Sequence, residues 1–128
     1  MRGDSAGYML WCGWRRCLEE LSDAAVRRER QSDALAISDK SLWELAWAIA
    51  KGRMRVLGPS RQFLETVERT FTVLPVTAAV AEQAALLSEL YPKDLADRVI
   101  GATALVHGME LITRDMRIRA SGEVPCVW

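Results

Sequence analysis

Short apolar runs alternate with segments of helical period along most of this 128-residue chain, and this alternation limits the possible folds more than any other feature. The runs are too apolar to face water, so they predict buried strands over 34–37, 71–76 and 110–113. Helical spacing predicts helices between and around them, over 42–50, 59–69, 78–90 and 95–107. Strands that alternate with helices in this way predict an α/β fold, a three-layer arrangement in which helices flank a mostly parallel central sheet.

Length, charge and cysteine content narrow the class of protein. A chain of 128 residues favours one domain with a substantial core. Its 17 basic and 17 acidic residues balance, which excludes a strongly basic nucleic-acid arm but allows a local basic patch. Three cysteines without metal-ligand spacing (Cys12, Cys17 and Cys126) predict a reduced, cytoplasmic protein. No apolar run is long enough for a membrane span, and no signal pattern predicts export.

The first 17 residues differ from the rest of the chain. They hold three glycines, two tryptophans and two cysteines without a clear period, whereas helical spacing begins at Leu18 and predicts a helix that starts there. The sequence therefore predicts an atypical N-terminal segment over 1–17 and an α/β domain over 18–128. Within that domain, the proline-containing run 124–128 predicts a short edge strand, since proline cannot donate to a central ladder.

Four acidic residues lie where predicted elements begin or end: Glu44, Asp94, Asp97 and Asp115. Asp115 lies at the end of the predicted strand segment, separated from residues 110–113 only by Arg114, and polar groups at the carboxyl ends of parallel strands commonly build the site of such a fold. Carboxylates that converge repel one another, and a divalent cation such as Mg²⁺, which prefers oxygen ligands, relieves that repulsion. The pattern therefore predicts a metal-dependent attack on a phosphate ester.

Several stretches that contain these acids resemble the motifs of PIN-domain ribonucleases of the VapC toxin type. They are Ser38 with Ser41–Ala46 and Lys51–Arg53, then Asp94–Ala104, then Leu111–Asp115, and finally Val124–Trp128. They follow one another in the family's order and with similar spacing, over about residues 18–128. The resemblance implies the PIN fold and a Mg²⁺- or Mn²⁺-dependent endoribonuclease toxin, which forms a homodimer and is held inactive by a cognate antitoxin.

The resemblance also implies roles for individual residues. Glu44, Asp97 and Asp115 match acidic residues of the catalytic metal site, and Asp4 is the nearest substitute for a further metal ligand. Thr113 and Asp94 take supporting positions beside that site. Lys51, Arg53, Arg55 and Arg98 are assigned to binding of the RNA backbone. Binding of the backbone requires cations but no recognition of bases.

The N-terminal segment departs from the family. The first motif of the family is an apolar strand that ends in Asp-Thr-His, whereas here Asp4 is the only acid before Glu19. Back-translation of residues 4–7, read one base later with chosen synonymous codons, gives Ile-Leu-Leu-Asp. When one further base is skipped inside the Tyr8 codon, the rest up to Trp14 gives His-Ala-Leu-Val-Trp-Val. We therefore hypothesise a frame-shifting deletion, restored before Leu18. The hypothesis predicts a lost central strand, a marginally stable or poorly soluble monomer, and weak RNA cleavage or none.

Each acidic candidate has a structural alternative. Asp94 is predicted foremost as a helix cap. Glu44, placed near a helix start, and Asp97 in a first helical turn are alternatively acids that stabilise a helix dipole. Asp115 is alternatively the start of a turn with Arg114.

The basic and aromatic candidates have alternatives too. Lys51, Arg53 and Arg55 are alternatively a solvated turn, and Trp43 and Trp47 are interpreted as core or partner-facing side chains rather than base-stacking ones.

Three functions stay open on these grounds. The chain is an RNA-cleaving toxin, or a catalytically impaired remnant that binds only an antitoxin or a dimer partner. The third alternative is an unrelated α/β binding domain, in which Glu44, Asp97 and Asp115 do not converge.

Overall fold

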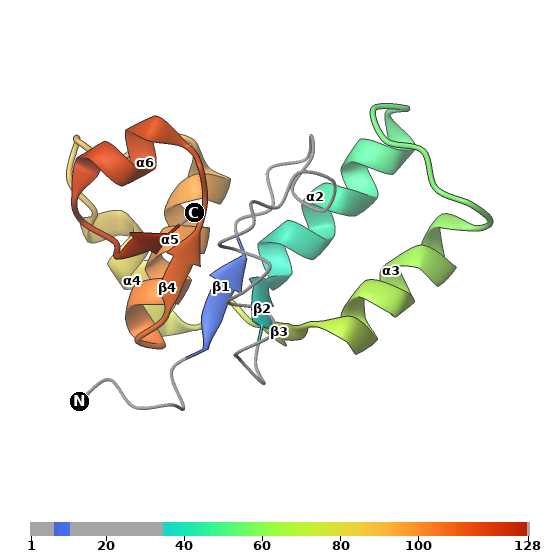
Figure 1. The fold of residues 1–128 in the computed structure, drawn as a ribbon, viewed down its shortest axis with the longest axis horizontal. Helices are drawn as coiled ribbons and strands as arrows, with labels where there is room; N and C mark the ends of the chain where they lie inside the picture. The colour runs from blue at the N-terminus through green and yellow to red at the C-terminus, as the bar shows by residue number, and fades with distance from the viewer. Residues whose placement is uncertain (1–6, 11–34, 128) are drawn as a thin grey trace.

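The computed structural model describes residues 7–10 and 35–127 (Figure 1). In these ranges five strands form one sheet in the order β3-β2-β1-β4-β5, and every neighbouring pair is parallel. The strands are β1 (Tyr8–Leu10), β2 (Leu35–Ser38), β3 (Thr72–Leu74), β4 (Glu110–Ile112) and β5 (Cys126–Val127). The helices are α2 (Asp39–Ala50), α3 (Ser60–Thr70), α4 (Ala78–Leu86), α5 (Leu95–Val106) and α6 (Met116–Ser121). The predicted α/β fold with a parallel sheet flanked by helices is confirmed.

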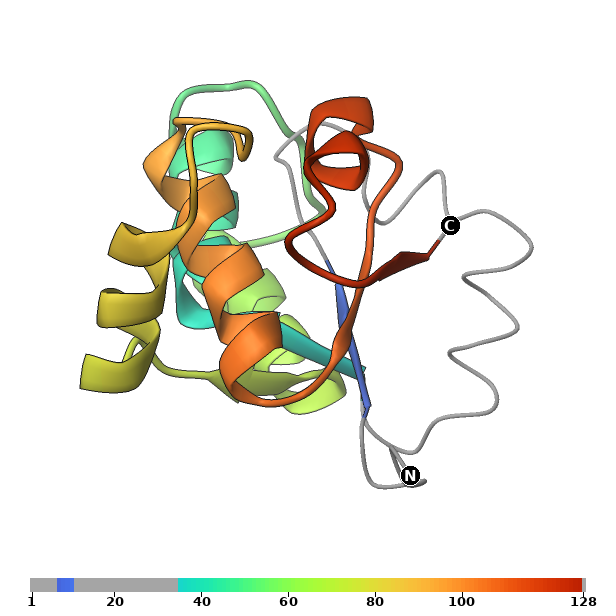
Figure 2. The same cartoon turned by 90° about the vertical axis from the view of Figure 1, so that its left-hand side faces the viewer.

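Four of the helices, α2 to α5, form two pairs beside the sheet. Helices α2 and α3 form a hairpin that projects away from the sheet in Figure 1, with residues 51–59 at its tip. Helices α4 and α5 pack against each other and lie together on one side of β1 and β4 in Figure 2. Helix α5 also contacts α2 of the hairpin.

The prediction of a lost central strand is wrong. Strand β1 lies in the middle of the sheet, where Met9 pairs with Ala36 of β2 on one side and with Leu111 of β4 on the other. Met9 is fully buried. The strand escaped prediction because three residues are too few to show a period, and only the two flanking strands select the extended conformation. Strands β2 and β4 therefore both have β1 as a partner, and their backbone groups at this position are not left unpaired by a missing strand.

Alternating residues of the strands enter two different core clusters, as the two-residue period of a strand requires. Ala36 and Leu111 belong to a cluster that also contains Ile100 of α5. The next residues along, Ile37 and Ile112, belong to a second cluster with side chains from α2 and α3. The central strands are thus buried on both faces, as their apolar sequences predict.

Most predicted elements are present, with bounds that differ by one to a few residues. Helix α4 ends at Leu86 rather than near Leu90, whose side chain is exposed and does not face inward as predicted. Helix α6 was not predicted, because its six residues are too short for a helical period and it begins only where Asp115 caps it. The predicted helix that starts at Leu18 lies outside the described residues.

Among the described residues, no helix is long and apolar enough to cross a membrane.

Candidate active site at the carboxyl edge of the sheet

Two buried hydroxyl groups shape the edge at which the parallel strands end. Ser38 is the last residue of β2, and its Oγ accepts a hydrogen bond from the backbone N–H of Lys40 at 3.0 Å. Thr113 follows β4, and its Oγ1 accepts a hydrogen bond from the backbone N–H of Asp115 at 3.0 Å. Both side chains are essentially inaccessible to solvent. Each hydroxyl therefore fixes the turn that leads from a strand into the next helix, which supports the predicted position of Thr113 beside the site.

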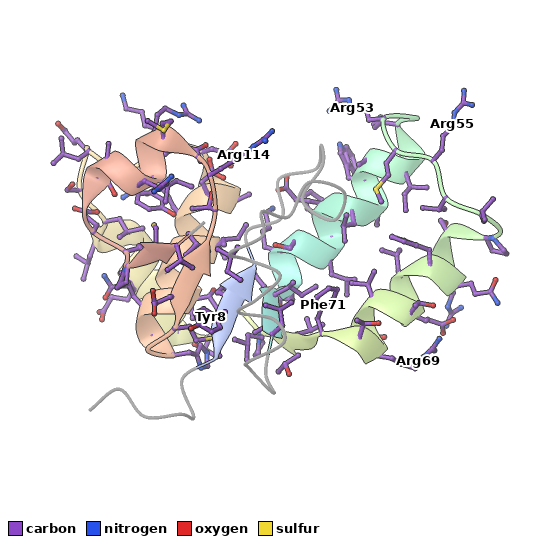
Figure 3. All side chains as sticks on the ribbon, in the orientation of Figure 1. Tyr8, Arg53, Arg55, Arg69, Phe71 and Arg114 are labelled. Atoms are coloured by element: carbon purple, nitrogen blue, oxygen red, sulfur yellow. The ribbon has the colours of Figure 1, made fainter. Side chains whose placement is uncertain are left out.

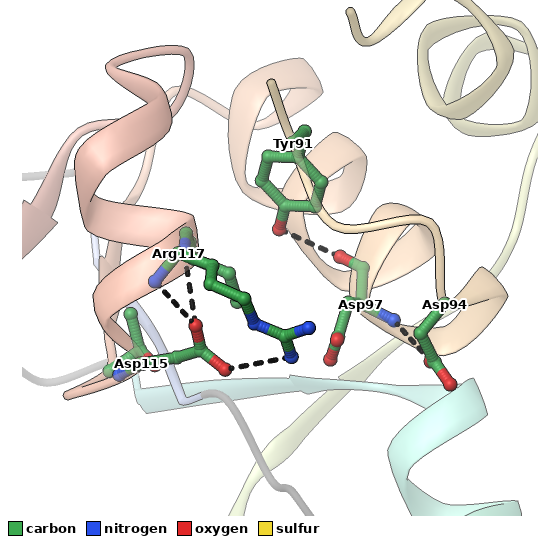
Figure 4. Close-up of polar contacts among 7 residues, drawn as sticks. Tyr91, Asp94, Asp97, Asp115 and Arg117 are labelled. Atoms are coloured by element: carbon green, nitrogen blue, oxygen red, sulfur yellow. Dashed lines mark hydrogen bonds and ion pairs between the residues drawn. The ribbon is translucent and has the colours of Figure 1, made fainter. Parts of the chain in front are cut away.

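Asp94 and Asp97 lie at the start of α5 (Figure 4). The Oδ1 atom of Asp94 accepts a hydrogen bond from the backbone N–H of Asp97 at 3.1 Å, so the predicted helix cap is confirmed. Asp97 is buried, and the hydroxyl of Tyr91 donates a hydrogen bond to its backbone carbonyl at 2.7 Å. The first turn of α5 is therefore held both by its cap and by a buried tyrosine.

Glu44 lies midway along α2, not near its start as predicted from the sequence. A role as a dipole-stabilising acid of the first turn is therefore wrong, and Asp39 occupies that turn instead. Burial raises the pKa of Glu44 above its ordinary value, the charge of Asp94 raises it further, Lys40 opposes the rise, and Asp97 adds to it. Glu44 therefore shares one electrostatic environment with the two acids of α5.

Asp115 caps α6 and approaches the same region from the other side. Its Oδ1 atom accepts hydrogen bonds from the backbone N–H groups of Arg117 and Ile118 at 2.9 and 3.1 Å, and its Oδ2 atom lies 3.6 Å from Nη2 of Arg117. Burial is the main cause of the raised pKa of the Tyr91 hydroxyl. The charges of Asp97 and Asp115 raise it further. Figure 4 shows Asp97 and Asp115 on either side of the Arg117 side chain in that view.

The charges of these acids act on shared neighbours, but the acids do not form a closed cluster. Glu44 is coupled to Asp94 and Asp97, while Asp97 and Asp115 are linked through their common neighbour Tyr91. Within ranges 7–10 and 35–127, no group of three or more His, Cys, Asp or Glu side chains is placed so that it could hold a metal ion. The remaining metal candidate, Asp4, lies outside these ranges.

The donor chemistry still fits a hard divalent cation. All four side chains offer carboxylate oxygens, and Mg²⁺ is usually held by one or two carboxylates together with waters and substrate phosphates. A pair such as Glu44 and Asp97 meets that requirement without a complete cage of protein ligands. Burial contributes most to the disfavoured charged form of Glu44, and repulsion from Asp94 and Asp97 adds to it.

The four cations predicted to hold RNA fall into two groups. Lys51, Arg53 and Arg55 are exposed at the tip of the α2–α3 hairpin, where Figure 3 shows the two arginines. Arg98 has a different role, because its guanidinium donates hydrogen bonds to the backbone carbonyls of Ala84, Leu87, Ser88 and Pro92. Arg98 thereby binds carbonyl groups at the end of α4 and in the loop that follows, and its assignment to RNA stays a prediction.

Three residues near the acids were not singled out from the sequence: Lys40, Tyr91 and Arg117. Lys40 precedes Glu44 by four positions on a helix, and that spacing already places the two side chains on one face. Arg117 and Tyr91 reach the acids only through the tertiary structure. Tyr91 fits because the neighbouring Gly101 has no Cβ atom, since an added Cβ would lie 2.7 Å from Cζ of the tyrosine.

Comparisons with known proteins identify the family. The profile of the PIN domain matches residues 16–123, a range that begins after β1. Ribonuclease VapC22 of Mycobacterium tuberculosis is 35% identical over 107 residues, which cover 84% of this chain and 82% of that protein. A chain of a toxin–antitoxin complex from Klebsiella pneumoniae aligns with a TM-score of 0.63 and 26% identity over 84% of both chains.

The fold is also shared with a more distant structure. A chain of the FitAB complex bound to a DNA fragment gives a TM-score of 0.62 over 82% of this chain and 81% of that chain, and its 20% identity supports likeness of fold alone. The match to the family profile and the identity to VapC22 extend over most of the chain. The chain therefore belongs to the PIN-domain family, and within that family to the VapC type.

Proposed function

We propose that this protein is a metal-dependent endoribonuclease, the toxin of a toxin–antitoxin pair, with Glu44, Asp97 and Asp115 as its acidic site. The observation that carries the proposal is the packing of α2, which bears Glu44, against α5, which bears Asp97, with Asp115 on the other side of Arg117 from Asp97 in Figure 4. The charges of Asp94 and Asp97, which act on Glu44, support the same arrangement. The relation to a protein named as a ribonuclease supports RNA as the substrate.

The residues have distinct tasks in this proposal. Glu44 and Asp97 would hold Mg²⁺ or Mn²⁺, and Asp115 would complete the ligand set or orient water next to it. A bound divalent cation would supply an activated water molecule and neutralise charge on the phosphodiester. Asp94 and Tyr91 position Asp97 through the hydrogen bonds to its backbone N–H and carbonyl groups. Lys51, Arg53 and Arg55 supply positive charge at the hairpin tip for the RNA backbone.

A second function, binding without catalysis, is favoured by one specific observation. The sequence between Asp4 and Glu19 contains no acid, although β1 ends at Leu10 in the centre of the site edge. A carboxylate directly after a central strand would be well placed to share a cation with acids on both sides. Its absence predicts weaker metal binding and slower cleavage, and in the extreme a protein that binds only its antitoxin. The hypothesis that a frame shift removed this acid stays a prediction.

Cleavage of labelled single-stranded RNA in Mg²⁺ or Mn²⁺, with and without a chelator, tests the proposal. We expect slow, metal-dependent cleavage that falls at least about 10–100-fold in Asp97→Asn, a loss known even for outer partners of metal sites. Glu65→Gln, on the exposed surface of α3, is the matched control and should leave the rate unchanged. Cleavage that persists in Asp97→Asn would contradict the site. A folded wild-type protein that never cleaves RNA but binds an antitoxin would favour the second function.

The partners are part of the same proposal. We propose a cognate antitoxin, because a chain with 26% identity and the same fold comes from a toxin–antitoxin complex. We further propose a homodimer, which light scattering on the purified protein would test directly.

A further inference from the structure

Four side chains form a continuous stack along the solvent-facing side of α2, and we call them the tryptophan column: Lys40, Trp43, Trp47 and Lys51. The two indole rings stack with their centroids 5.4 Å apart and their planes inclined by 27°. The ammonium of Lys40 lies 4.0 Å from the centroid of the Trp43 ring, and that of Lys51 lies 5.0 Å from the centroid of the Trp47 ring. The order along the helix is therefore cation, ring, ring, cation.

The column is a surface feature, so of the two predicted alternatives for Trp43 and Trp47 the core one is wrong and the partner-facing one stays open. Trp43 is 53% exposed and Trp47 is 50% exposed. The buried face of α2 is formed instead by Ser41, Leu45 and Ala48. Single exposed hydrophobic side chains are normal, but exposed apolar side chains that form a continuous patch often mark an interaction site.

The column connects the acidic site with the basic tip of the hairpin. At one end, Lys40 lies close enough to Glu44 to lower the pKa of that carboxyl group. At the other end, Lys51 leads into the tip that carries Arg53 and Arg55 (Figure 3). Eleven positions separate Lys40 from Lys51, which corresponds to about 16 Å along the helix axis.

We propose that the tryptophan column binds single-stranded RNA and guides it from the hairpin tip to the acidic site. Bases would stack on the indole rings, while the lysines and the arginines of the tip contact phosphates. The choice of RNA as the occupant rests on the proposed ribonuclease function. Charge supports it as well, since both ends of the column are cationic, whereas lysine is depleted from the contact regions of protein–protein interfaces.

Magnitudes show that a base can displace a lysine from a ring. An exposed contact between a cation and an aromatic ring contributes about 2–5-fold to an equilibrium constant. A base stacked on an aromatic side chain contributes about 5–100-fold in affinity. A phosphate can attract the ammonium of Lys40 or Lys51 away from its tryptophan ring. A base that then stacks on the ring contributes more to affinity than the lost contact between the ammonium and the ring did.

RNA binding without cleavage tests the column separately from the nuclease. Fluorescence anisotropy would follow a labelled single-stranded oligoribonucleotide in the Asp97→Asn background, in the presence of a chelator. We expect Trp43→Ala and Trp47→Ala each to weaken binding about 10-fold, and Lys51→Ala to weaken it and to reduce its dependence on salt. Two matched controls on other exposed surfaces, Leu86→Ala and Arg69→Ala, should stay within about 2-fold.

The outcomes separate the column from the nuclease. Tryptophan-dependent binding by a protein that never cleaves RNA would support the column and count only against the nuclease. If the protein cleaves RNA and the Trp43→Ala and Trp47→Ala variants bind RNA as tightly as the parent, the RNA-binding role of the tryptophan column is wrong. The proposed ribonuclease function is then unaffected. The column is also overturned if the two variants dissociate a dimer or an antitoxin complex yet bind RNA normally, because its occupant would then be a protein. Circular dichroism and urea unfolding would verify that each exposed substitution leaves the fold intact.

Discussion

Replacement of Met9 by alanine tests whether the N-terminal segment supplies the central strand. Met9 is fully buried between Ala36 and Leu111 and belongs to the core cluster that includes Ile100 of α5. If residues 1–17 were detached from the domain, as their composition suggests, the substitution would leave stability unchanged. In the observed fold it removes a side chain from the middle of the core.

The expected loss can be worked out from burial. A buried methionine stabilises the fold by about 1.5–3 kcal/mol through transfer from water alone, and the remaining cavity brings the cost of Met→Ala to about 2–5 kcal/mol. The cavity cannot collapse easily, because β1 is paired on both sides. A loss of about 3 kcal/mol is a large part of the roughly 5–15 kcal/mol that stabilises a typical domain.

Urea unfolding measures this difference against a control of the same residue type. With a slope of about 2 kcal/mol per molar urea, a loss of about 3 kcal/mol lowers the midpoint by about 1.5 M. Met116, at the start of α6, is 74% exposed, so Met116→Ala should change the free energy of unfolding by no more than about 0.5 kcal/mol. Equal midpoints for the two variants would refute the central position of β1.

Two further predictions concern the surroundings of Asp97. Gly101→Ala should destabilise the protein by about 1–3 kcal/mol in urea unfolding, although alanine favours helices, because the new Cβ would lie 2.7 Å from Cζ of the buried Tyr91. An increase in stability would show that the tyrosine moves freely. Glu44→Gln should be more stable than the wild type at neutral pH, because a raised folded-state pKa means that the charged form destabilises the fold. The difference should shrink as the pH falls through that raised pKa toward the ordinary value of 4.5, and a variant that is less stable at neutral pH would contradict this sign.

The coupled acids also connect stability with the proposed chemistry. Without a cation, the negative charges of Asp94 and Asp97 disfavour the ionised form of Glu44. A cation held between such carboxylates would relieve that repulsion, so metal binding should stabilise the folded state. A perturbed ionisation of this kind is common at functional sites.

Local sequence determined much of the fold by itself. The capping side chains Asp94 and Thr77 accept hydrogen bonds from the first turns of α5 and α4, as their positions before helical runs predict. The apolar run at β2 predicts a buried strand because its residues have no polar alternation. The position of Asp115 just beyond the apolar run of β4 predicts its place at a strand end. These predictions depend only on neighbours within one or two turns of chain.

The tertiary structure alone decided the remaining features. Three residues of β1 carry no period of their own, and they form the central strand because β2 and β4 pair with them from both sides. Arg98 binds the end of α4 because the packing of α4 on α5 brings four carbonyl groups within its reach. The charge of Asp97 acts on Glu44 because α2 packs against α5. Contacts between residues far apart in sequence depend on the geometry of packing, and no local pattern of residues encodes that geometry.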